Sequence, residues 1–318
     1  MKLEDVRNVS VIGAGIMGHG IAQTYALAGY QVSINDVNDS LLDNAMEHIK
    51  ADLDVLVDDA FISQNEVNNA LCRITTTSDL EKAVCDSDFV TEAIIEDSEA
   101  KRKLFDQLDV LCPPRTVLAS NSSSLLISDF ASGIRRRDKV ILTHWFNPPH
   151  IVPAVEIIRG RETSDETAEL VYALLKKVGK MPVRILKEIP GYLVNRIQMA
   201  MIREVWYLWE QGIASPEDID LAVRGSLGFR LASIGPLLTA DMAGIDTYYR
   251  VTKYLFPLIN DSHEPPLTIR KMVEDGQLGA KSGKGVFDHS QEEWNKIIKR
   301  RDKEFLRRLK ALYRSEKD

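Results

Sequence analysis

The residues best suited to acid/base chemistry are a histidine and a glutamate twelve positions apart. His144 closes an apolar segment at Val140–Thr143, and Glu156 lies in a second one at Ala154–Ile157. A carboxylate flanked by β-branched residues is expected to be partly buried and to need a hydrogen-bonding partner. If that partner is one imidazole nitrogen, the glutamate fixes the tautomer and leaves the other nitrogen to accept a proton from a hydroxyl group. The alternative is a structural histidine at a strand end.

A glycine-rich segment near the amino terminus is typical of a dinucleotide-binding turn. An apolar run leads into the pattern G-x-G-x-x-G at Gly13, Gly15 and Gly18, and a helical pattern follows. The first glycine permits a tight turn, the second lets the backbone approach a pyrophosphate, and the third allows close helix packing. Asp36 ends the next apolar run, where an acid can accept hydroxyls of an adenine ribose, and Val37–Ser40 contains no Lys or Arg to neutralise a 2′-phosphate. The pattern therefore predicts a site for NAD rather than NADP. The alternative is a glycine-rich turn that binds no cofactor.

The elements that must position these residues follow an alternating order. From Val9 to about Ile185, short β-branched runs alternate with helical patterns, which predicts an α/β fold of the Rossmann type, a doubly wound parallel sheet covered on both faces. Ligands bind at the carboxyl ends of such strands, and His144 is expected there. The predicted strands are Val9–Ile12, Val32–Asn35, Phe89–Ala93, Thr116–Ala119, Val140–Thr143, Ala154–Ile157 and Pro182–Ile185.

The carboxyl-terminal part is predicted to be all α. The strand pattern stops after Lys187, and a long helical pattern runs from Tyr192 to about Gln211. We therefore predict an NAD-binding domain over residues 1–187 and a helical substrate and dimerisation domain over residues 188–318. The segment Glu292–Ser315 has helical spacing of apolar residues among many Lys and Arg, which indicates a packing helix or, alternatively, a membrane-surface or partner helix.

Composition excludes several classes of protein. The chain has 318 residues, of which 44% are apolar, and 40 Lys and Arg stand against 47 Asp and Glu, for a net charge of −7. No positive field is available to attract nucleic acid, and no apolar run is long enough to span a membrane. Three cysteines without C-x-x-C spacing predict neither a disulfide framework nor a metal site. We expect a cytoplasmic homodimer that acts on a small-molecule substrate and has no nucleic-acid or membrane partner.

Five segments of the chain resemble the motifs of the L-3-hydroxyacyl-CoA dehydrogenase superfamily, and they occur in the same order as in that family. The resemblance runs from Val9 to about Phe287. The superfamily also includes enzymes that act on free hydroxy acids, among them the L-gulonate 3-dehydrogenase or lambda-crystallin branch. The five segments are Asn121–Leu125, His144–Pro148, Pro153–Glu156, Pro190–Arg196 and Lys281–Gly285.

The resemblance implies roles for four catalytic residues. His144 would be the general acid/base and Glu156 its orienting partner. Ser123 would hydrogen-bond the reacting oxygen or the nicotinamide carboxamide, and Asn195 would hold the same substrate oxygen from the helical domain. The alternatives are a helix N-cap for Ser123 and a solvent-facing helix residue for Asn195.

The same resemblance implies further contacts with the cofactor, NAD. Glu96, Lys101 and Asn147 match positions that line its ribose and nicotinamide, and Lys281 matches one that reaches it from the second domain. Each of the four is alternatively an ordinary surface or turn residue.

Two features depart from the acyl-CoA members of this family. Residues 51–60 carry four acids and no base, where acyl-CoA enzymes tend to offer basic residues to the CoA phosphates. Asn147–Pro153 and Ser226–Leu231 look more like the free-acid branch, and Arg230 is a candidate clamp for a substrate carboxylate or, alternatively, part of a helix-end ion pair. The main hypothesis is an NAD-dependent 3-hydroxyacyl-CoA dehydrogenase. The alternatives are the same reaction on a free polar hydroxy acid, and a non-catalytic dinucleotide-binding structural protein.

Overall fold

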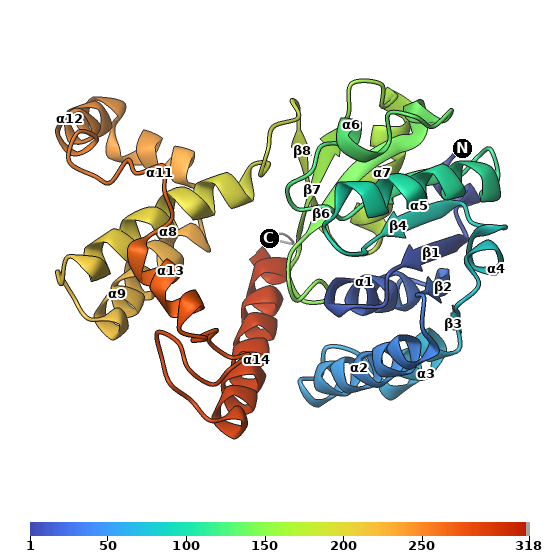
Figure 1. Cartoon of the computed structure of the whole chain (residues 1–318), viewed down its shortest axis with the longest axis horizontal. Helices are drawn as coiled ribbons and strands as arrows, with labels where there is room; N and C mark the ends of the chain where they lie inside the picture. The colour runs from blue at the N-terminus through green and yellow to red at the C-terminus, as the bar shows by residue number, and fades with distance from the viewer. Residues whose placement is uncertain (316–318) are drawn as a thin grey trace. The chain divides into compact units, whose positions relative to one another are not determined.

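The computed structural model describes residues 1–315 of the chain (Figure 1). It contains two compact units: the first comprises Met1–Leu193 together with the chain from Lys299 onward, and the second is Val194–Ile298. The division lies a few residues after the predicted boundary at residue 187. The end of the last helix groups with the first unit, whereas the sequence placed it in the helical domain.

The first unit is built on one sheet of eight strands in the order β3-β2-β1-β4-β5-β6-β7-β8 (Figure 1). The seven predicted strands are present with shifts of one or two residues at their ends, and the Rossmann-type fold class is confirmed. The strand β3 was not predicted, because its sequence has one apolar residue followed by three threonines. The strands are β1 (Asn8–Ile12), β2 (Gln31–Asn35), β3 (Ile74–Thr77), β4 (Phe89–Glu92), β5 (Val117–Ser120), β6 (Val140–Trp145), β7 (Ala154–Arg159) and β8 (Met181–Ile185).

One pair of strands differs from the predicted parallel arrangement. All neighbouring strands are parallel except β6 and β7, which are antiparallel. Only residues 146–153 connect them, which is shorter than the dozen or more residues that a parallel crossover needs. The antiparallel register places His144 directly opposite Glu156. The sheet itself therefore brings the two residues together.

Helices cover both faces of this sheet. Alternate residues of single strands belong to different cores: Phe89 and Ile141 pack with α1, α2 and α7, whereas Val90 and Leu142 pack with α5 and α6. This alternation is expected for a strand buried on both faces. The helices of this unit are α1 (Ile16–Leu27), α2 (Asp39–Asp58), α3 (Gln64–Leu71), α4 (Leu80–Val84), α5 (Ser98–Leu111), α6 (Ile127–Phe130) and α7 (Asp165–Lys177), with 3₁₀ turns at Leu3–Asp5 and Arg137–Lys139.

The second unit is helical, as predicted. Ser215 caps α9 by accepting a hydrogen bond from the backbone N–H of Asp218, and Pro216 occupies its first turn. A π-helical segment, Val223–Gly228, joins α9 to α10. The helices are α8 (Val194–Glu210), α9 (Pro216–Ala222), α10 (Phe229–Leu231), α11 (Pro236–Ala243), α12 (Ile245–Leu255) and α13 (Leu267–Glu274).

The last helix, α14 (Gln291–Ser315), is a packing helix over its second half. Leu306 and Leu309 are buried in the core of the first unit, and Phe305 packs against the same core. Lys310 donates a hydrogen bond to the carbonyl of Asp59. Across the described residues, none of the helices combines the length and the apolar character needed to cross a bilayer.

Candidate active site

His144 and Glu156 form a buried hydrogen-bonded pair. His144 Nδ1 lies 2.7 Å from Glu156 Oε2, and the glutamate is 0% exposed. The second carboxylate oxygen, Oε1, accepts a hydrogen bond of 3.0 Å from the backbone N–H of Leu193. With both oxygens engaged the carboxylate is fixed, and with Nδ1 engaged Nε2 is the nitrogen that can exchange a proton. The pairing expected from the twelve-residue spacing is therefore present.

Two aromatic rings hold the imidazole of His144. The rings of Phe146 and Tyr192 contact it edge-on, with centroids at 4.6 Å and 5.3 Å. Tyr192 is fully buried, its hydroxyl donates a 2.6 Å hydrogen bond to the carbonyl of Leu125, and its φ of 52° lies in the left-handed region. A bulky residue in this region is strained, and such strain is concentrated at functional sites. In the sequence, Tyr192 is evident only as a member of the motif Pro190–Arg196.

The loop after β5 is organised by a single carboxylate. Glu96 Oε1 accepts hydrogen bonds from the Ser122 hydroxyl at 2.6 Å and from the backbone N–H groups of Ser123 and Ser124, both at 2.9 Å. Ser123 is exposed and its Oγ lies 3.4 Å from the same oxygen. It is not the N-cap of the next helix, because that position is Leu126. Of the two explanations for Ser123, the capping role is thus excluded.

Glu96 is strongly acidic because of these contacts. Burial acts to raise the pKa of its carboxyl group, but the hydrogen bonds from Ser122 and Ser124 and the charge of Lys101 lower that pKa to about 2. Lys101 is 1% exposed, and its ammonium lies 2.6 Å from Glu92 Oε1 and 3.4 Å from Glu96 Oε2. The ammonium is therefore enclosed between two acids, and any effect of Lys101 on a cofactor runs through Glu96.

Glu92 is a site residue that sequence reasoning missed. It is 0% exposed at the end of β4, and its second oxygen accepts a 2.5 Å hydrogen bond from the Ser120 hydroxyl. A buried acid of this kind needs a cationic partner, which Lys101 supplies. The signal was available as an acid within the apolar strand pattern, but its partner lies on α5 and is not evident from spacing.

The glycine turn has the geometry that a dinucleotide requires. Gly13 has a φ of 103°, and a Cβ there would lie 2.5 Å from the carbonyl oxygen of Ala93. A Cβ on Gly18 would lie 1.8 Å from the carbonyl oxygen of Gly13, whereas one on Gly15 would meet nothing within 4 Å. The first and third glycines are therefore required for packing. The open space at Gly15, before the amino terminus of α1, fits a pyrophosphate.

Asp36 lies beside this turn. Its Oδ2 accepts a 2.7 Å hydrogen bond from the backbone N–H of Ala14, and Oδ1 accepts one of the same length from Val37. These contacts fix the carboxylate at the carboxyl end of β2, next to the turn, as a ribose-binding acid requires. Asn147 is exposed just beyond β6, at the same edge of the sheet.

Three predicted residues belong to the second unit. Asn195 lies in the first turn of α8, two residues after Leu193 along the chain. Lys281 is exposed. Arg230 is exposed and donates weak hydrogen bonds to the carbonyl and hydroxyl of Ser226, at 3.4 Å and 3.3 Å. Within the described part of the chain no carboxylate lies within 4.0 Å of the Arg230 guanidinium, so the alternative of a helix-end ion pair is not observed.

The four acids of the segment 51–60 do not all face the solvent. Asp52 points toward the protein, where its Oδ2 lies 3.5 Å from His19 Nε2 and 3.4 Å from His150 Nδ1. Asp54 and Asp58 are exposed. One of the four acids is thus engaged with imidazoles of the first unit.

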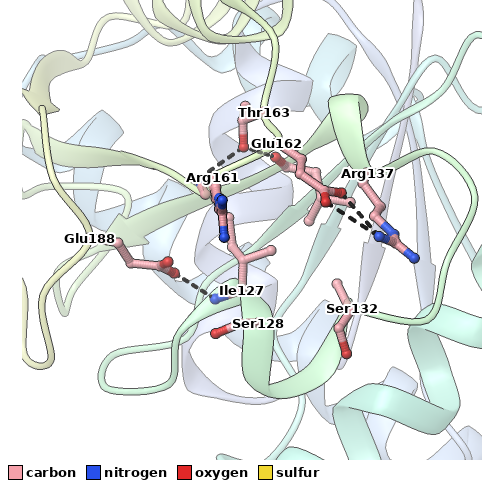
Figure 2. Close-up of a pocket in the computed structure, with 11 residues that line it drawn as sticks. Ile127, Ser128, Ser132, Arg137, Arg161, Glu162, Thr163 and Glu188 are labelled. Atoms are coloured by element: carbon pink, nitrogen blue, oxygen red, sulfur yellow. Dashed lines mark hydrogen bonds and ion pairs between the residues drawn. The ribbon is translucent and has the colours of Figure 1, made fainter.

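Figure 2 shows a small cavity of about 160 Å³ between α6 and the end of β7. Three of its four charged groups are engaged with the protein: Glu188 accepts a 2.7 Å hydrogen bond from the backbone N–H of Ile127, and Arg137 pairs with Glu162 at 3.3 Å. Burial raises the pKa of Glu188. None of the predicted catalytic or cofactor residues lines this cavity, so the candidate active site lies elsewhere.

A Rossmann-type sheet, a glycine turn that fits a pyrophosphate, and a buried histidine–glutamate pair at the strand ends define a class of protein, the NAD-dependent dehydrogenases. Two family models cover nearly the whole chain: 3-hydroxyacyl-CoA dehydrogenase, NAD binding domain, matches residues 8–189, and 3-hydroxyacyl-CoA dehydrogenase, C-terminal domain, matches residues 191–289. The chain belongs to the 3-hydroxyacyl-CoA dehydrogenase family. It is an NAD-dependent oxidoreductase that acts on a CH–OH group and interconverts a hydroxy and an oxo group.

Similar proteins include enzymes with different named substrates. A probable 3-hydroxybutyryl-CoA dehydrogenase of Bacillus subtilis is 38% identical over 90% of this chain and 99% of its own length. The human lambda-crystallin homolog is 36% identical over 74% of each chain. The crystal structure of 5-formyl-3-hydroxy-2-methylpyridine 4-carboxylic acid 5-dehydrogenase, an NAD+-dependent dismutase, has a TM-score of 0.88 at 30% identity and covers 95% of this chain and 96% of its own.

Proposed function

We propose that the protein interconverts an L-3-hydroxyacyl-CoA and the corresponding 3-oxoacyl-CoA, with His144 as the general acid/base. The observation that carries this proposal is the buried 2.7 Å contact between His144 and Glu156 at the carboxyl end of β6. The similarity to 3-hydroxybutyryl-CoA dehydrogenases over nearly their whole length supports the thioester as substrate.

In this proposal each catalytic residue has a distinct role. NAD, when bound, accepts the hydride from the carbinol carbon. His144 Nε2 takes the proton of the substrate hydroxyl, and the buried carboxylate of Glu156 stabilises the imidazolium that results. Ser123 and Asn195 would donate hydrogen bonds to the same substrate oxygen, which accumulates negative charge as the proton leaves.

The proposed cofactor site combines backbone and side chains. The turn at Gly13, Gly15 and Gly18 and the amino terminus of α1 would hold the pyrophosphate, and Asp36 would accept hydrogen bonds from the adenine ribose. The residues proposed to line the nicotinamide and its ribose, directly or through a neighbour, are Glu96, Lys101, Asn147 and Lys281.

A panel of substrates tests the proposed substrate class. We expect NADH formation with 3-hydroxybutyryl-CoA and longer thioesters, little with free hydroxy acids, and no marked effect of Arg230→Met on the KM for the thioester, which carries no carboxylate for Arg230 to bind. The free-acid alternative makes the opposite prediction: efficient turnover of a free acid, with its KM raised about ten- to a hundredfold by Arg230→Met, because a charge-assisted bidentate contact is lost.

The cofactor preference is a second test. The carboxylate of Asp36 should repel the 2′-phosphate of NADP. It should also lose the hydrogen bond that the free 2′-hydroxyl of NAD donates. We therefore expect kcat/KM for NAD to exceed that for NADP by about two orders of magnitude. Asp36→Ser should narrow this ratio. Equal use of the two cofactors by the unmodified protein would show that Asp36 does not contact the ribose.

We further propose a cytoplasmic homodimer that associates through the second unit. Support for the dimer comes from large apolar side chains that this unit exposes, and support for the reducing compartment from three cysteines that are all unpaired. The intact pair of His144 and Glu156 argues against the alternative that the whole protein is a non-catalytic, dinucleotide-binding structural protein. The five most exposed large apolar residues of this unit are Phe229, Leu237, Met242, Tyr254 and Leu267.

A further inference from the structure

A second cavity in the first unit lies apart from the proposed active site. Its volume is about 340 Å³, within the range of small-molecule sites. None of the residues proposed for catalysis or for NAD binding lines it. Helix α14 supplies one of its walls, and this helix lies beyond residue 289, where the C-terminal family model ends. The apolar part of the lining is Leu27, Ala28, Leu56, Phe61, Ile62, Ile151, Val178 and Leu309.

One lining residue, Lys180, has a buried ammonium group without an acidic partner among the described residues. Lys180 is 7% exposed, and its Nζ donates hydrogen bonds to the carbonyls of Pro149 at 2.6 Å and Val152 at 2.9 Å. Among the described residues, no carboxylate oxygen lies within 4.0 Å of this nitrogen. Burial lowers the pKa of Lys180 to about 7. A buried cation is normally compensated by an anion. Here two neutral carbonyls accept hydrogen bonds from two of the three N–H donors, and the centroid of the Trp145 ring lies 5.3 Å from the nitrogen.

The other polar groups of the cavity favour an anion as well. Lys177 is an exposed residue that also lines the cavity, and its ammonium lies 4.9 Å from the centroid of the Tyr30 ring. His150 is 9% exposed and its Nδ1 has no hydrogen-bond partner, although Asp52 Oδ2 is 3.4 Å away. Burial lowers the pKa of His150 to about 4, so this ring is neutral at pH 7.

The one acid in the lining is already engaged. Glu66 is exposed, and its Oε2 accepts hydrogen bonds from the backbone N–H and the hydroxyl of Ser63, at 2.8 Å and 2.7 Å, where it completes the cap of α3. Its carboxylate is therefore held away from Lys180 by the capping box. The one acid in the lining therefore does not neutralise the charge of Lys180.

We propose that this cavity binds a small carboxylic acid with a short aliphatic chain. The carboxylate would pair with the Lys180 ammonium, and the chain would lie against the apolar wall that Leu56, Phe61 and Leu309 provide. A singly charged group fits better than a phosphate, because the carboxyl ends of α1 and α7, at Ala28 and Val178, line the cavity and present partial negative charge. No arginine is present in the lining to bind a phosphate in a bidentate manner.

Calorimetric titration of sodium hexanoate into the full-length protein saturated with NADH tests the proposal. We expect saturable binding of one hexanoate per chain. Hexylamine and hexan-1-ol, which have the same chain without the carboxylate, should bind at least tenfold more weakly. Equal binding of hexylamine, or no saturable heat with hexanoate, would overturn the proposal.

Variants locate the bound carboxylate. Lys180→Met keeps most of the aliphatic stem and should weaken hexanoate binding about ten- to a hundredfold, since a charge-assisted contact is lost. Lys176→Met is the matched control, because Lys176 is an exposed lysine on α7 that does not line the cavity. Ala28→Phe fills the cavity from a partly exposed position and should abolish binding, which keeps the test decisive even if Lys180→Met does not fold.

A further variant separates this site from the proposed active site. His144→Gln should leave hexanoate affinity unchanged. If this variant loses hexanoate binding while Ala28→Phe retains it, the carboxylate binds at the active site and the proposed cavity site is wrong. The proposed dehydrogenase reaction does not depend on either result, because it is measured by NADH formation.

Discussion

His144→Gln is expected to lower kcat by about two to four orders of magnitude and to leave the affinity for NADH nearly unchanged. The reduction reflects the loss of a general base, since glutamine can donate and accept hydrogen bonds but cannot take up the hydroxyl proton. NADH should still bind, because the cofactor site proposed at the glycine turn and Asp36 does not include the imidazole. Steady-state turnover and a fluorescence titration with NADH measure the two quantities.

Glu156→Gln is the matched comparison for this result. The glutamine keeps the shape of the side chain and can still orient the ring, but it no longer stabilises a positive imidazolium. The acidic limb of the pH dependence of kcat/KM for alcohol oxidation should therefore move to lower pH. Near-normal turnover in His144→Gln, or an unchanged pH profile in Glu156→Gln, would contradict the assigned dyad.

The parts of the site that follow from local sequence could be predicted. The turn at Gly13, Gly15 and Gly18 is specified by a backbone conformation and by two close approaches that only glycine allows. The strand that carries His144 was evident from its β-branched run, and the partner Glu156 was evident because an acid in an apolar strand needs compensation. The turn and the strand depend on neighbours within a few residues. The pairing of Glu156 depends on one large energetic effect, the cost of burying a carboxylate without a partner.

The features that were not predicted depend on contacts between distant segments. The antiparallel pairing of β6 with β7 is decided by a connection too short for a crossover, which becomes evident only when both strand ends are known accurately. The second half of α14 returns to the first unit, and its amphipathic pattern alone does not say which surface it covers. The strand β3 has little apolar character of its own and is stabilised by pairing with β2.

The buried network around Lys101 is another case of distant contacts. Glu92 and Lys101 are nine positions apart, on β4 and α5, and together with Glu96 they connect the sheet to the loop that carries Ser123. The family resemblance implied a cofactor role for Lys101, but the enclosure of its ammonium by two acids is a property of the folded unit. This network is the basis for a prediction about stability.

Lys101→Met is expected to lower the free energy of unfolding by about 3–5 kcal/mol, because it leaves the carboxylate of Glu92 buried without its cation. The methionine fills the volume of the aliphatic stem, so the loss reflects charge more than packing. Glu92→Gln combined with Lys101→Met should recover much of the stability, since the double variant has no uncompensated buried charge. Urea unfolding followed by circular dichroism measures these differences.

Lys103→Met provides the control for this prediction. Lys103 is on the same helix, but its ion pair with Glu99 at 2.8 Å is exposed, and its removal should change stability little. Lys101→Met should also raise the KM for the substrate and for NAD, because Glu96 loses the charge that fixes it beneath the Ser122–Ser124 loop. If Lys101→Met is no less stable than Lys103→Met, the buried pair does not stabilise the fold, and the loop of Ser123 must be held by the hydrogen bonds to Glu96 alone.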